Sequence, residues 1–235
     1  MPVAATHAKA PRPAALPPHN RSRRKEARPA ELLDAALTLF VEKGFAATRV
    51  EEVAALAGVS KGTLFLYFPS KEELFKEVIR QNIAGRIVEW NARFERFQGG
   101  TAEMLRLAMV QWWEQLGATK ASGMIKLVLS EARNFPEIAV FYQQEVIEPG
   151  QNLMRRILQR GIDRGEFRVV NLDYAIYSVI APMIFLIMWK HSMAPCLSAC
   201  ALSVLIDPHE YLRSQVDILL DGLVVRAAKP GRKGK

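Results

Sequence analysis

Cysteine and histidine are scarce in this chain of 235 residues, which contains two cysteines and four histidines. Two cysteines are too few for the disulfide framework of a small secreted domain, and such usage is typical of a reducing compartment. Cys196 and Cys200 lie four residues apart near His191, but this spacing matches none of the usual zinc patterns. We therefore expect a cytoplasmic protein without a metal or other cofactor, in which both cysteines have packing roles.

The sequence also lacks the motifs of the common enzyme classes. It contains no P-loop, no HExxH pair and no nucleophile elbow. Two of its histidines, His7 and His19, lie in an N-terminal segment rich in proline and alanine, a composition typical of disorder. We expect that the protein is not an enzyme.

No hydrophobic run has the length of a membrane span. The most apolar stretch, YAIYSVIAPMIFLIMW at 174–189, would form about 24 Å of helix against the roughly 30 Å of a bilayer core, and it contains Pro182. No apolar signal-peptide core precedes Arg21. We therefore expect a buried helix at 174–189 and no membrane partner.

The positive charge is concentrated at the two ends of the chain, although the net charge is +8 overall. Residues 1–30 contain seven bases and one acid, and residues 226–235 contain five bases and no acid, so acids outnumber bases between them. We predict a disordered basic arm at 1–25 and a disordered basic tail at 226–235. Such segments can follow a polyanion such as nucleic acid, but the charge can also serve solubility alone.

Apolar residues recur with helical spacing through most of the chain, and no strand-like alternation is sustained. The sequence therefore predicts an all-α fold. The first helix should begin near Pro29 and end at Gly44, and the fourth should run from Ser70 to Gly99. Later helices are predicted near 101–116, 121–133, 137–164 with an interruption at Pro149–Gly150, 173–190 and 208–225.

Residues 49–68 have the pattern of two short helices joined by a tight turn. Thr48 and Glu51 have the spacing of a capping box for the first helix, and Ser60 can cap the second. Ala54 and Gly58 supply the small side chain and the free backbone that a close crossing requires. This pattern is typical of a helix-turn-helix motif, whose second helix enters the major groove of DNA.

The second helix of this motif begins with groups that suit DNA. Lys61 lies at a helix N-terminus, where the side chain and the helix dipole both favour phosphate, and Gly62 allows close approach of a backbone. Thr63 suits base edges, and Phe65 and Tyr67 add flat surface and a phenol. Lys71, at the start of the next helix, predicts a further phosphate contact.

The stretch LLDAALTLFVEKGFAATRVEEVAALAGVSKGTLFLYFPSKEELF, residues 32–75, resembles the DNA-binding domain of the TetR family of transcriptional repressors. The resemblance implies a helix-turn-helix DNA-binding domain at 26–86, with the motif at 49–68, and a helical ligand-binding and dimerisation domain at 87–225. Where the family often has Tyr-Tyr-His, this chain has Phe65-Leu66-Tyr67. The DNA contacts expected from the motif and the resemblance are Thr48, Arg49, Ser60, Lys61, Gly62, Thr63, Phe65, Tyr67 and Lys71.

One short recognition helix reads only a few base pairs, so we expect a homodimer on double-stranded DNA with a palindromic operator. The apolar run at 174–189 and the apolar stripe at 211–223 each have more hydrophobic surface than one core face requires. The surplus faces are expected to pair as a four-helix bundle, as the family resemblance implies. The alternative is that both faces are buried within one subunit.

Aromatic and methionine side chains are frequent between these two regions. They can line a pocket for a small apolar or aromatic inducer, as the resemblance implies, or form an ordinary core. The candidate pocket residues are Met109, Trp112, Trp113, Glu131, Phe135, Phe141, Tyr142 and Met183.

These observations together predict a homodimeric repressor that a small lipophilic ligand releases from its operator. One alternative is a ligand-independent DNA-binding or chromosome-organising protein of the same fold, which would have no accessible pocket. Another is a helical lipid-binding protein, which would not bind DNA even at low salt.

Overall fold

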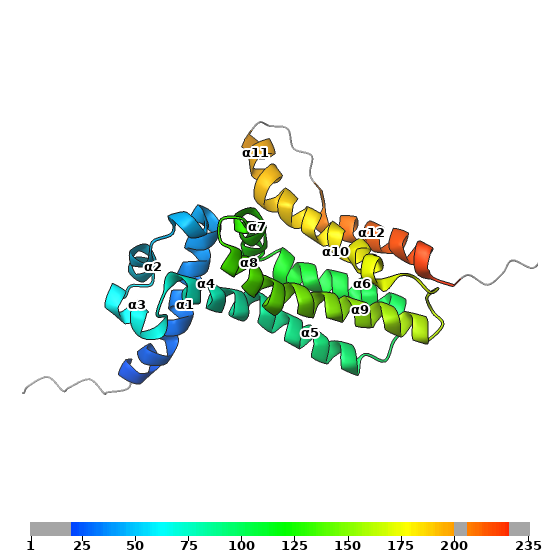
Figure 1. Ribbon diagram of the computed structural model, residues 1–235, viewed down its shortest axis with the longest axis horizontal. Coiled ribbons are helices and arrows are strands. Elements are labelled where there is room, and N and C mark those ends of the chain that lie inside the picture. Colours follow the sequence, from blue (N-terminus) through cyan, green and yellow to red (C-terminus); the bar gives the residue numbers. More distant parts are fainter. Residues whose placement is uncertain (1–19, 200–205, 226–235) are drawn as a thin grey trace, which may run out of the picture.

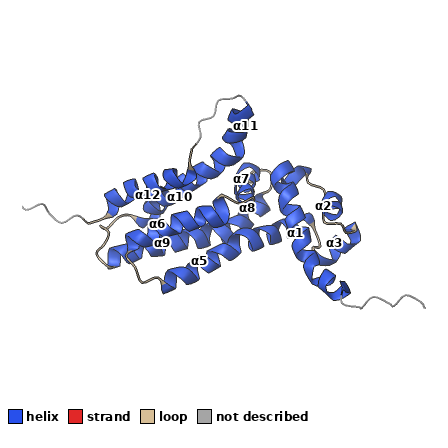
Figure 2. Cartoon of the chain, turned by 180° about the vertical axis from the view of Figure 1, so that it is seen from behind, coloured by secondary structure: helices blue, strands red, loops and turns tan. Residues whose placement is uncertain are grey.

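The computed structural model describes residues 20–199 and 206–225, and helices make up most of this part of the chain (Figure 1). The described ranges contain no strand beyond an isolated bridge between Phe167 and Val224, as the view from behind also shows (Figure 2). The all-α prediction is confirmed. The predicted tail at 226–235, and residues 1–19 of the predicted arm, lie outside the described residues.

The first helix, α1, spans Asn20–Ala47 and therefore begins well before the predicted start at Pro29. Residues 20–25, which we expected to be disordered, are helical. Proline suits the first turn of a helix best, but within α1 it removes one backbone hydrogen bond and the helix continues. Gly44 does interrupt α1 as predicted, because its φ of 85° is outside the helical range.

Three further helices complete the N-terminal part of the molecule: α2 (Val50–Leu56), α3 (Lys61–Tyr67) and α4 (Lys71–Ile79). They gather around α1 at one end of the molecule (Figure 1). Their core contains Phe40, Phe45 and Phe75, whose ring centroids lie 5.2 to 5.8 Å apart. Leu64, fully buried, fastens α3 to this core.

The caps of these short helices are mostly as predicted. The side chains of Ser60 and Ser70 accept hydrogen bonds from the backbone N–H groups of Thr63 and Glu73, each at 3.1 Å. The capping box at Thr48 and Glu51 was wrong, because Arg49 is the N-cap of α2 and its N–H bonds to Glu52.

Thr48 instead serves the end of α1. Its hydroxyl lies 2.7 Å from the carbonyl oxygen of Gly44 and 3.1 Å from that of Leu39. These carbonyls need a donor because the helix is interrupted at Gly44.

A long helix connects the two parts of the molecule, as predicted for the fourth helix. It consists of α4, a π-helical segment η1 (Arg80–Ala84) and α5 (Gly85–Arg96). α4 packs against α1, while α5 packs against α9, so this helix belongs to both parts.

The remaining helices form the C-terminal part and match the predicted layout in most places. The interruption within 137–164 lies at residues 143–147, not at Pro149, because Pro149 occupies the first turn of its helix, where no N–H is needed. The helix at 194–199 was not predicted. The bounds are α6 Thr101–Trp112, η2 Trp113–Gly117, α7 Ser122–Glu131, α8 Pro136–Tyr142, η3 Gln143–Ile147, α9 Glu148–Asp163, α10 Leu172–Met188, η4 Trp189–Met193, α11 Ala194–Ala199 and α12 Pro208–Leu223.

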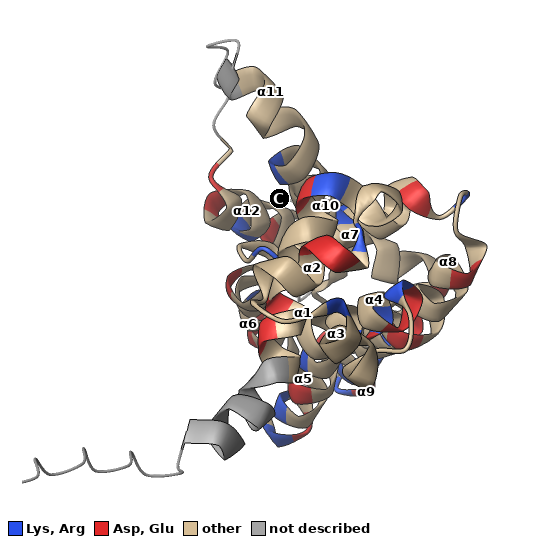
Figure 3. Cartoon of the chain, turned by 90° about the vertical axis from the view of Figure 1, so that its left-hand side faces the viewer, with Lys and Arg blue, Asp and Glu red and all other residues tan. Residues whose placement is uncertain are grey.

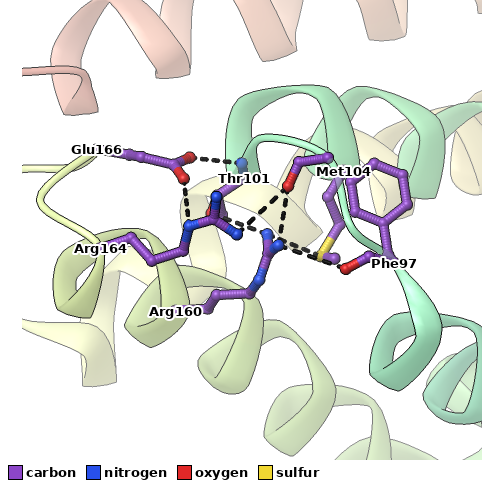
Figure 4. A network of polar contacts seen from close by, with 7 residues as sticks. Phe97, Thr101, Met104, Arg160, Arg164 and Glu166 are labelled. Atoms are coloured by element: carbon purple, nitrogen blue, oxygen red, sulfur yellow. Dashed lines mark hydrogen bonds and ion pairs between the residues drawn. The ribbon is translucent and has the colours of Figure 1, made fainter.

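An arginine from α9 fastens the loop between α5 and α6 (Figure 4). The guanidinium of Arg160 donates to the carbonyl oxygen of Gly99 at 2.8 Å and to the hydroxyl of Thr101 at 3.0 Å. Glu166 accepts from the backbone N–H of Thr101 and pairs with Arg164 at 2.7 Å. Partial burial opposes ionisation of Glu166, but the bonds from Thr101 and the nearby arginines outweigh it and lower the pKa of this carboxyl.

The apolar helix α10 continues through η4 and α11, so that Leu172–Leu197 is long and apolar enough by composition to cross a membrane. The sequence-based length estimate was therefore wrong, because the helix does not stop at Lys190 and His191. The prediction of a buried helix was also wrong, since only 28% of its most apolar window is buried. A large apolar face of this helix remains exposed on the described chain.

Candidate DNA interface and ligand cavity

The corner between α2 and α3 depends on the backbone of Gly58. Its φ of 67° is in the left-handed region, and a Cβ built there would meet no described atom within 4 Å. Glycine is therefore needed for conformation and not for space. The corner places α3 at the surface at one end of the molecule, as the end-on view shows (Figure 3).

The outer surface of α3 carries side chains that the fold itself does not bury. Lys61, Phe65 and Leu66 are exposed, and Leu66 is 83% exposed although it is hydrophobic. At Gly62, a Cβ would approach no described atom closer than the Ser60 hydroxyl at 3.8 Å. The subunit itself therefore has room for a side chain at Gly62, which leaves this backbone open to a partner.

Lys61 is held by an acidic neighbour from α2. Its ammonium pairs with the carboxylate of Glu51 at 2.5 Å and lies 5.7 Å from the Phe65 ring centroid. The hydrogen bond from Lys61 is the largest cause that lowers the pKa of Glu51. Both side chains are about half exposed, and exposed ion pairs contribute little to stability, so a phosphate can replace Glu51 at little cost.

Lys71, which we expected to contact phosphate, has an intramolecular role. Its ammonium donates to the carbonyl oxygens of Phe45, Thr48 and Ala46 at 2.9, 3.2 and 3.3 Å. An ammonium has three N–H donors, so these bonds use all of them. Lys71 ties the end of α1 to the start of α4.

The other predicted contacts differ in how much surface they offer. Thr48 is 1% exposed, so its side chain cannot reach DNA from this structure. Arg49 is exposed at the start of α2, and Tyr67 is partly buried in α3. The hydroxyls of Ser60 and Thr63 lie 2.9 Å apart beside the N-terminus of α3.

A cavity of about 690 Å³ lies in the C-terminal part of the molecule, between α5, α6, η3, α9 and α10. One face of the η1–α5 segment supplies much of its wall. The residues of this wall were not predicted to line a pocket, although their helical spacing is visible in the sequence. These residues are Ile83, Ile87, Trp90, Phe94 and Phe97.

Half of the predicted pocket residues line this cavity. They are Met109, Trp112, Tyr142 and Met183. The other four, Trp113, Glu131, Phe135 and Phe141, are not among the lining residues.

Three of these four lie where the two parts of the molecule meet. The Phe135 ring packs edge-on against Phe45 with centroids 4.8 Å apart. Phe141 lies 5.0 Å from the Arg80 guanidinium, and Glu131 lies near Gly44. Periodicity could not distinguish a cavity wall from this junction, because both require apolar side chains on α7 and α8.

The fourth, Trp113, lies at a basic group of η4. The ammonium of Lys190 is 5.8 Å from the Trp113 ring centroid and donates to the carbonyl oxygens of Gly117 and Ala118, both at 2.8 Å. Burial lowers the pKa of Lys190.

No cluster of three potential metal ligands occurs in the part of the chain that the structure describes. The thiol of Cys196 is exposed and contacts the carbonyl oxygen of Ser192 at 3.3 Å. Cys200 lies outside the described residues.

A helix-turn-helix with an exposed second helix, joined to a helical domain with a cavity, defines a DNA-binding regulator. The model for bacterial regulatory proteins of the tetR family matches residues 32–78, and the model for a tetracyclin repressor-like C-terminal domain matches residues 98–195. The chain belongs to the TetR family of DNA-binding transcriptional regulators.

Curated relatives agree with this assignment. The HTH-type transcriptional regulator YfiR of Bacillus subtilis is 30% identical over 148 residues, which cover 62% of this chain and 71% of YfiR. RutR of Escherichia coli is 35% identical over 135 residues, covering 57% of this chain and 55% of RutR. The chain thus spans little more than half the length of RutR. The repressor KstR2 of Rhodococcus jostii is 44% identical over 64 residues, covering 27% of this chain and 31% of KstR2.

Solved structures share the fold. The fatty acid degradation regulator FadR of Bacillus halodurans superposes with a TM-score of 0.66 and 22% identity, covering 82% of this chain and 94% of FadR. A transcriptional regulator of Saccharomonospora viridis in complex with choline gives a TM-score of 0.68 and 19% identity, covering 86% of this chain and all of that chain. FadR of Bacillus subtilis in complex with stearoyl-CoA gives a TM-score of 0.59 and 19% identity, covering 82% of this chain and 98% of FadR.

Proposed function

We propose that this protein is a cytoplasmic, homodimeric repressor that binds a palindromic operator and leaves it when a small lipophilic ligand enters the C-terminal cavity. The cavity of about 690 Å³ is the observation that carries the ligand-responsive part of the proposal, because its size is typical of small-molecule sites. An accessible pocket also favours this proposal over a ligand-independent DNA-binding protein of the same fold.

For DNA binding, α3 of each subunit enters the major groove, with successive grooves about 34 Å apart. Lys61 and Arg49 approach phosphates, and the backbone at Gly62 approaches the DNA closely. Leu66 joins the predicted contacts because an exposed leucine suits the thymine methyl group, the apolar group of the major groove. The proposed contacts are Arg49, Ser60, Lys61, Gly62, Thr63, Phe65, Leu66 and Tyr67.

For dimerisation, the exposed apolar faces of α10 and α12 pair with those of a second copy. Tyr174 on α10 is 74% exposed and Ile218 on α12 is 64% exposed, and the two helices pack against each other within the subunit. Large exposed apolar patches of this kind mark interaction sites.

The dimer surface can be tested with a matched pair of variants. We expect Ile218→Glu to convert the dimer to monomer in sedimentation velocity at micromolar concentration. Val88→Glu, at a similarly exposed valine on α5, should remain dimeric. A dimeric Ile218→Glu variant would contradict the proposed interface.

For the release of DNA, the protein must have a second form that does not fit DNA. The ligand must bind this second form more tightly than it binds the DNA-binding form. Each tenfold preference contributes about 1.4 kcal/mol to the shift. α8 is the proposed route, because Tyr142 lines the cavity while its neighbour Phe141 lies against Arg80 and within 5.8 Å of the Lys76 ammonium. A shift of α8 therefore acts directly on the helix that follows α3.

Structural neighbours of this chain have been solved with different ligands. One FadR was solved with stearoyl-CoA and another structural neighbour with choline, so this fold accommodates ligands of different chemistry. Among these, the apolar wall of the present cavity favours a lipophilic molecule.

Selection of genomic fragments by the purified protein tests the proposal. The selected fragments should share a palindromic sequence. Fluorescence anisotropy should show that the protein binds this sequence with a nanomolar or lower dissociation constant. Lipophilic compounds are then titrated against the complex, and reporter transcription from the same fragment distinguishes repression from activation. Failure to retain any duplex at low salt would contradict DNA binding, whereas retention that no ligand alters would contradict the ligand response alone.

A further inference from the structure

We propose that the hydroxyl of Tyr142 is the polar anchor of the cavity, and that the buried end of the ligand is an uncharged group with a carbonyl-type oxygen on an apolar body. This inference rests on the proposed function, because it assigns a chemical class to the ligand of the same cavity. A ketone, an ester and a lactone all fit this class.

The first observation is the state of Tyr142 itself. It is the C-terminal residue of α8, lines the cavity and is only 4% exposed. Its hydroxyl makes no hydrogen bond to any residue in the described ranges. No fully buried side-chain nitrogen or oxygen in the described residues lacks a partner, so this hydroxyl is open to the cavity that Tyr142 lines. A ligand acceptor in the cavity would supply that partner.

A second hydrogen-bond donor in the lining also lacks a protein acceptor. Trp112 on α6 is 7% exposed and lines the cavity, and its indole N–H also lacks a hydrogen bond to the described part of the chain. The indole group can only donate. Two donors that face the cavity without a protein acceptor favour an oxygen on the ligand that can only accept.

The other polar groups of the lining are placed differently. Gln151 already donates to the Tyr177 hydroxyl at 3.2 Å, and Tyr177 is half exposed. Gln143 and Arg93 are exposed and Gln111 is half-buried. Tyr142 is therefore the buried hydroxyl among the lining residues, and the polar groups nearer to solvent are left for any hydrophilic part of the ligand.

The charge of the lining excludes an ionised group at the buried end. Arg93 is the charged side chain among the lining residues, and it is exposed. A buried carboxylate without a partner cation would lose its hydration at a large cost. Burial raises the pKa of the Tyr142 phenol, so this group remains a neutral donor at physiological pH.

Matched probes of equal chain length test the class of ligand. N-phenyl-1-naphthylamine, a fluorescent apolar dye, is bound to the full-length protein and displaced with 2-dodecanone, dodecane or dodecanoate. The ketone should bind more tightly than the alkane and the carboxylate. Tighter binding of dodecanoate than of 2-dodecanone would overturn the inference.

The variant Tyr142→Phe keeps the ring and removes the hydroxyl. We expect this variant to bind 2-dodecanone about five- to tenfold more weakly, because one neutral hydrogen bond is lost. Its affinity for dodecane should be unchanged. Tyr211→Phe, at a tyrosine that is not among the lining residues, is the matched control and should not change either affinity. Thermal unfolding and operator binding without ligand should match the parent protein, which shows that the variant folds.

The outcomes separate this inference from the proposed function. If the probes bind but Tyr142→Phe weakens none of them selectively, the inference fails and a ligand-responsive repressor remains. If neither dye nor probe binds, the inference and the ligand response both fail, and operator binding is judged from its own measurement.

Discussion

The ammonium of Lys71 lies 4.5 Å from the centre of the Phe45 ring and donates a 2.9 Å hydrogen bond to the carbonyl oxygen of the same residue. Phe45 is fully packed between Phe40, Phe75 and Phe135. Lys71 therefore joins the start of α4 to the aromatic core at the end of α1, which positions the helices on either side of α2 and α3.

The variant Lys71→Met tests this structural role. It keeps the aliphatic stem but removes the donors to Phe45 and Thr48, so we expect the free energy of unfolding to fall by about 1–2 kcal/mol. Urea denaturation measures the change. Lys61→Met, at an exposed ion pair, should change the free energy of unfolding much less than Lys71→Met.

The same two variants differ in their effect on DNA binding. Lys61→Met should reduce the slope of log affinity against log salt by about 0.9, the contribution of one phosphate contact. Lys71→Met should leave this slope unchanged at temperatures where it is folded. The reverse pattern would return Lys71 to the set of phosphate contacts and remove Lys61.

Glu51 restrains Lys61 in the free protein and places a negative charge beside the proposed interface. Glu51→Gln should therefore tighten operator binding several-fold at low salt, with less effect at high salt, because the released ammonium then meets phosphate without competition. Anisotropy titrations at two salt concentrations measure this. Glu52→Gln, which breaks the neighbouring pair with Lys43, is the control and should have a smaller effect. Equal effects of both variants would argue against a specific role of Glu51.

Gly62 offers a test in which stability and function change in opposite directions. Gly62→Ala should raise the free energy of unfolding by up to about 1 kcal/mol, because alanine favours a helix and the site has room for its methyl group. The same methyl group should weaken operator binding at least tenfold if the backbone approaches DNA closely. Unchanged affinity in the more stable variant would remove Gly62 from the interface.

Leu66 is expected to read a thymine methyl group. Once an operator is known, deoxyuridine is substituted for each thymidine in turn, which removes one methyl group at a time. At one symmetric pair of positions, this substitution should weaken operator binding by the parent protein several-fold. It should not weaken operator binding by Leu66→Ala. A uniform response of both proteins at every position would contradict contact between Leu66 and a methyl group.

The pH dependence of stability should report on His191. Its imidazole Nε2 lies 2.8 Å from the Ser122 hydroxyl, and partial burial, followed by Lys190 and Lys126, lowers the pKa of His191 below 6.5. The unfolded chain then binds a proton more readily than the folded one, so stability is present above about pH 6.5 and falls as the pH drops below this value. Denaturation at pH 7.5, 6.5 and 5.5 should show a smaller decline for His191→Gln than for the parent protein.

Features that depend on residues close together in the sequence were predicted well. The caps at Ser60 and Ser70 each accept an N–H from the residue three positions later. Gly58 was identified because a tight corner needs a left-handed residue. The chain also resembled its family most densely over 32–75, the segment that contains these local signals.

Features that depend on distant residues were not predicted. Nothing near Lys71 in the sequence indicates that its partner is Phe45, which is 26 residues away. Periodicity marks Ile87 and Phe141 alike as apolar helix positions, so it did not place Phe141 outside the cavity and Ile87 within it.

The sequence by itself determined the all-α architecture, the helix-turn-helix corner and membership of the family, because helix propensity, capping and turn conformation act over a few residues. Only the tertiary structure decided that Lys71 and Thr48 serve the core, which residues enclose the cavity and that Tyr142 lacks a polar partner there. Those outcomes depend on which helix faces meet, and that is settled by packing among segments far apart in the chain.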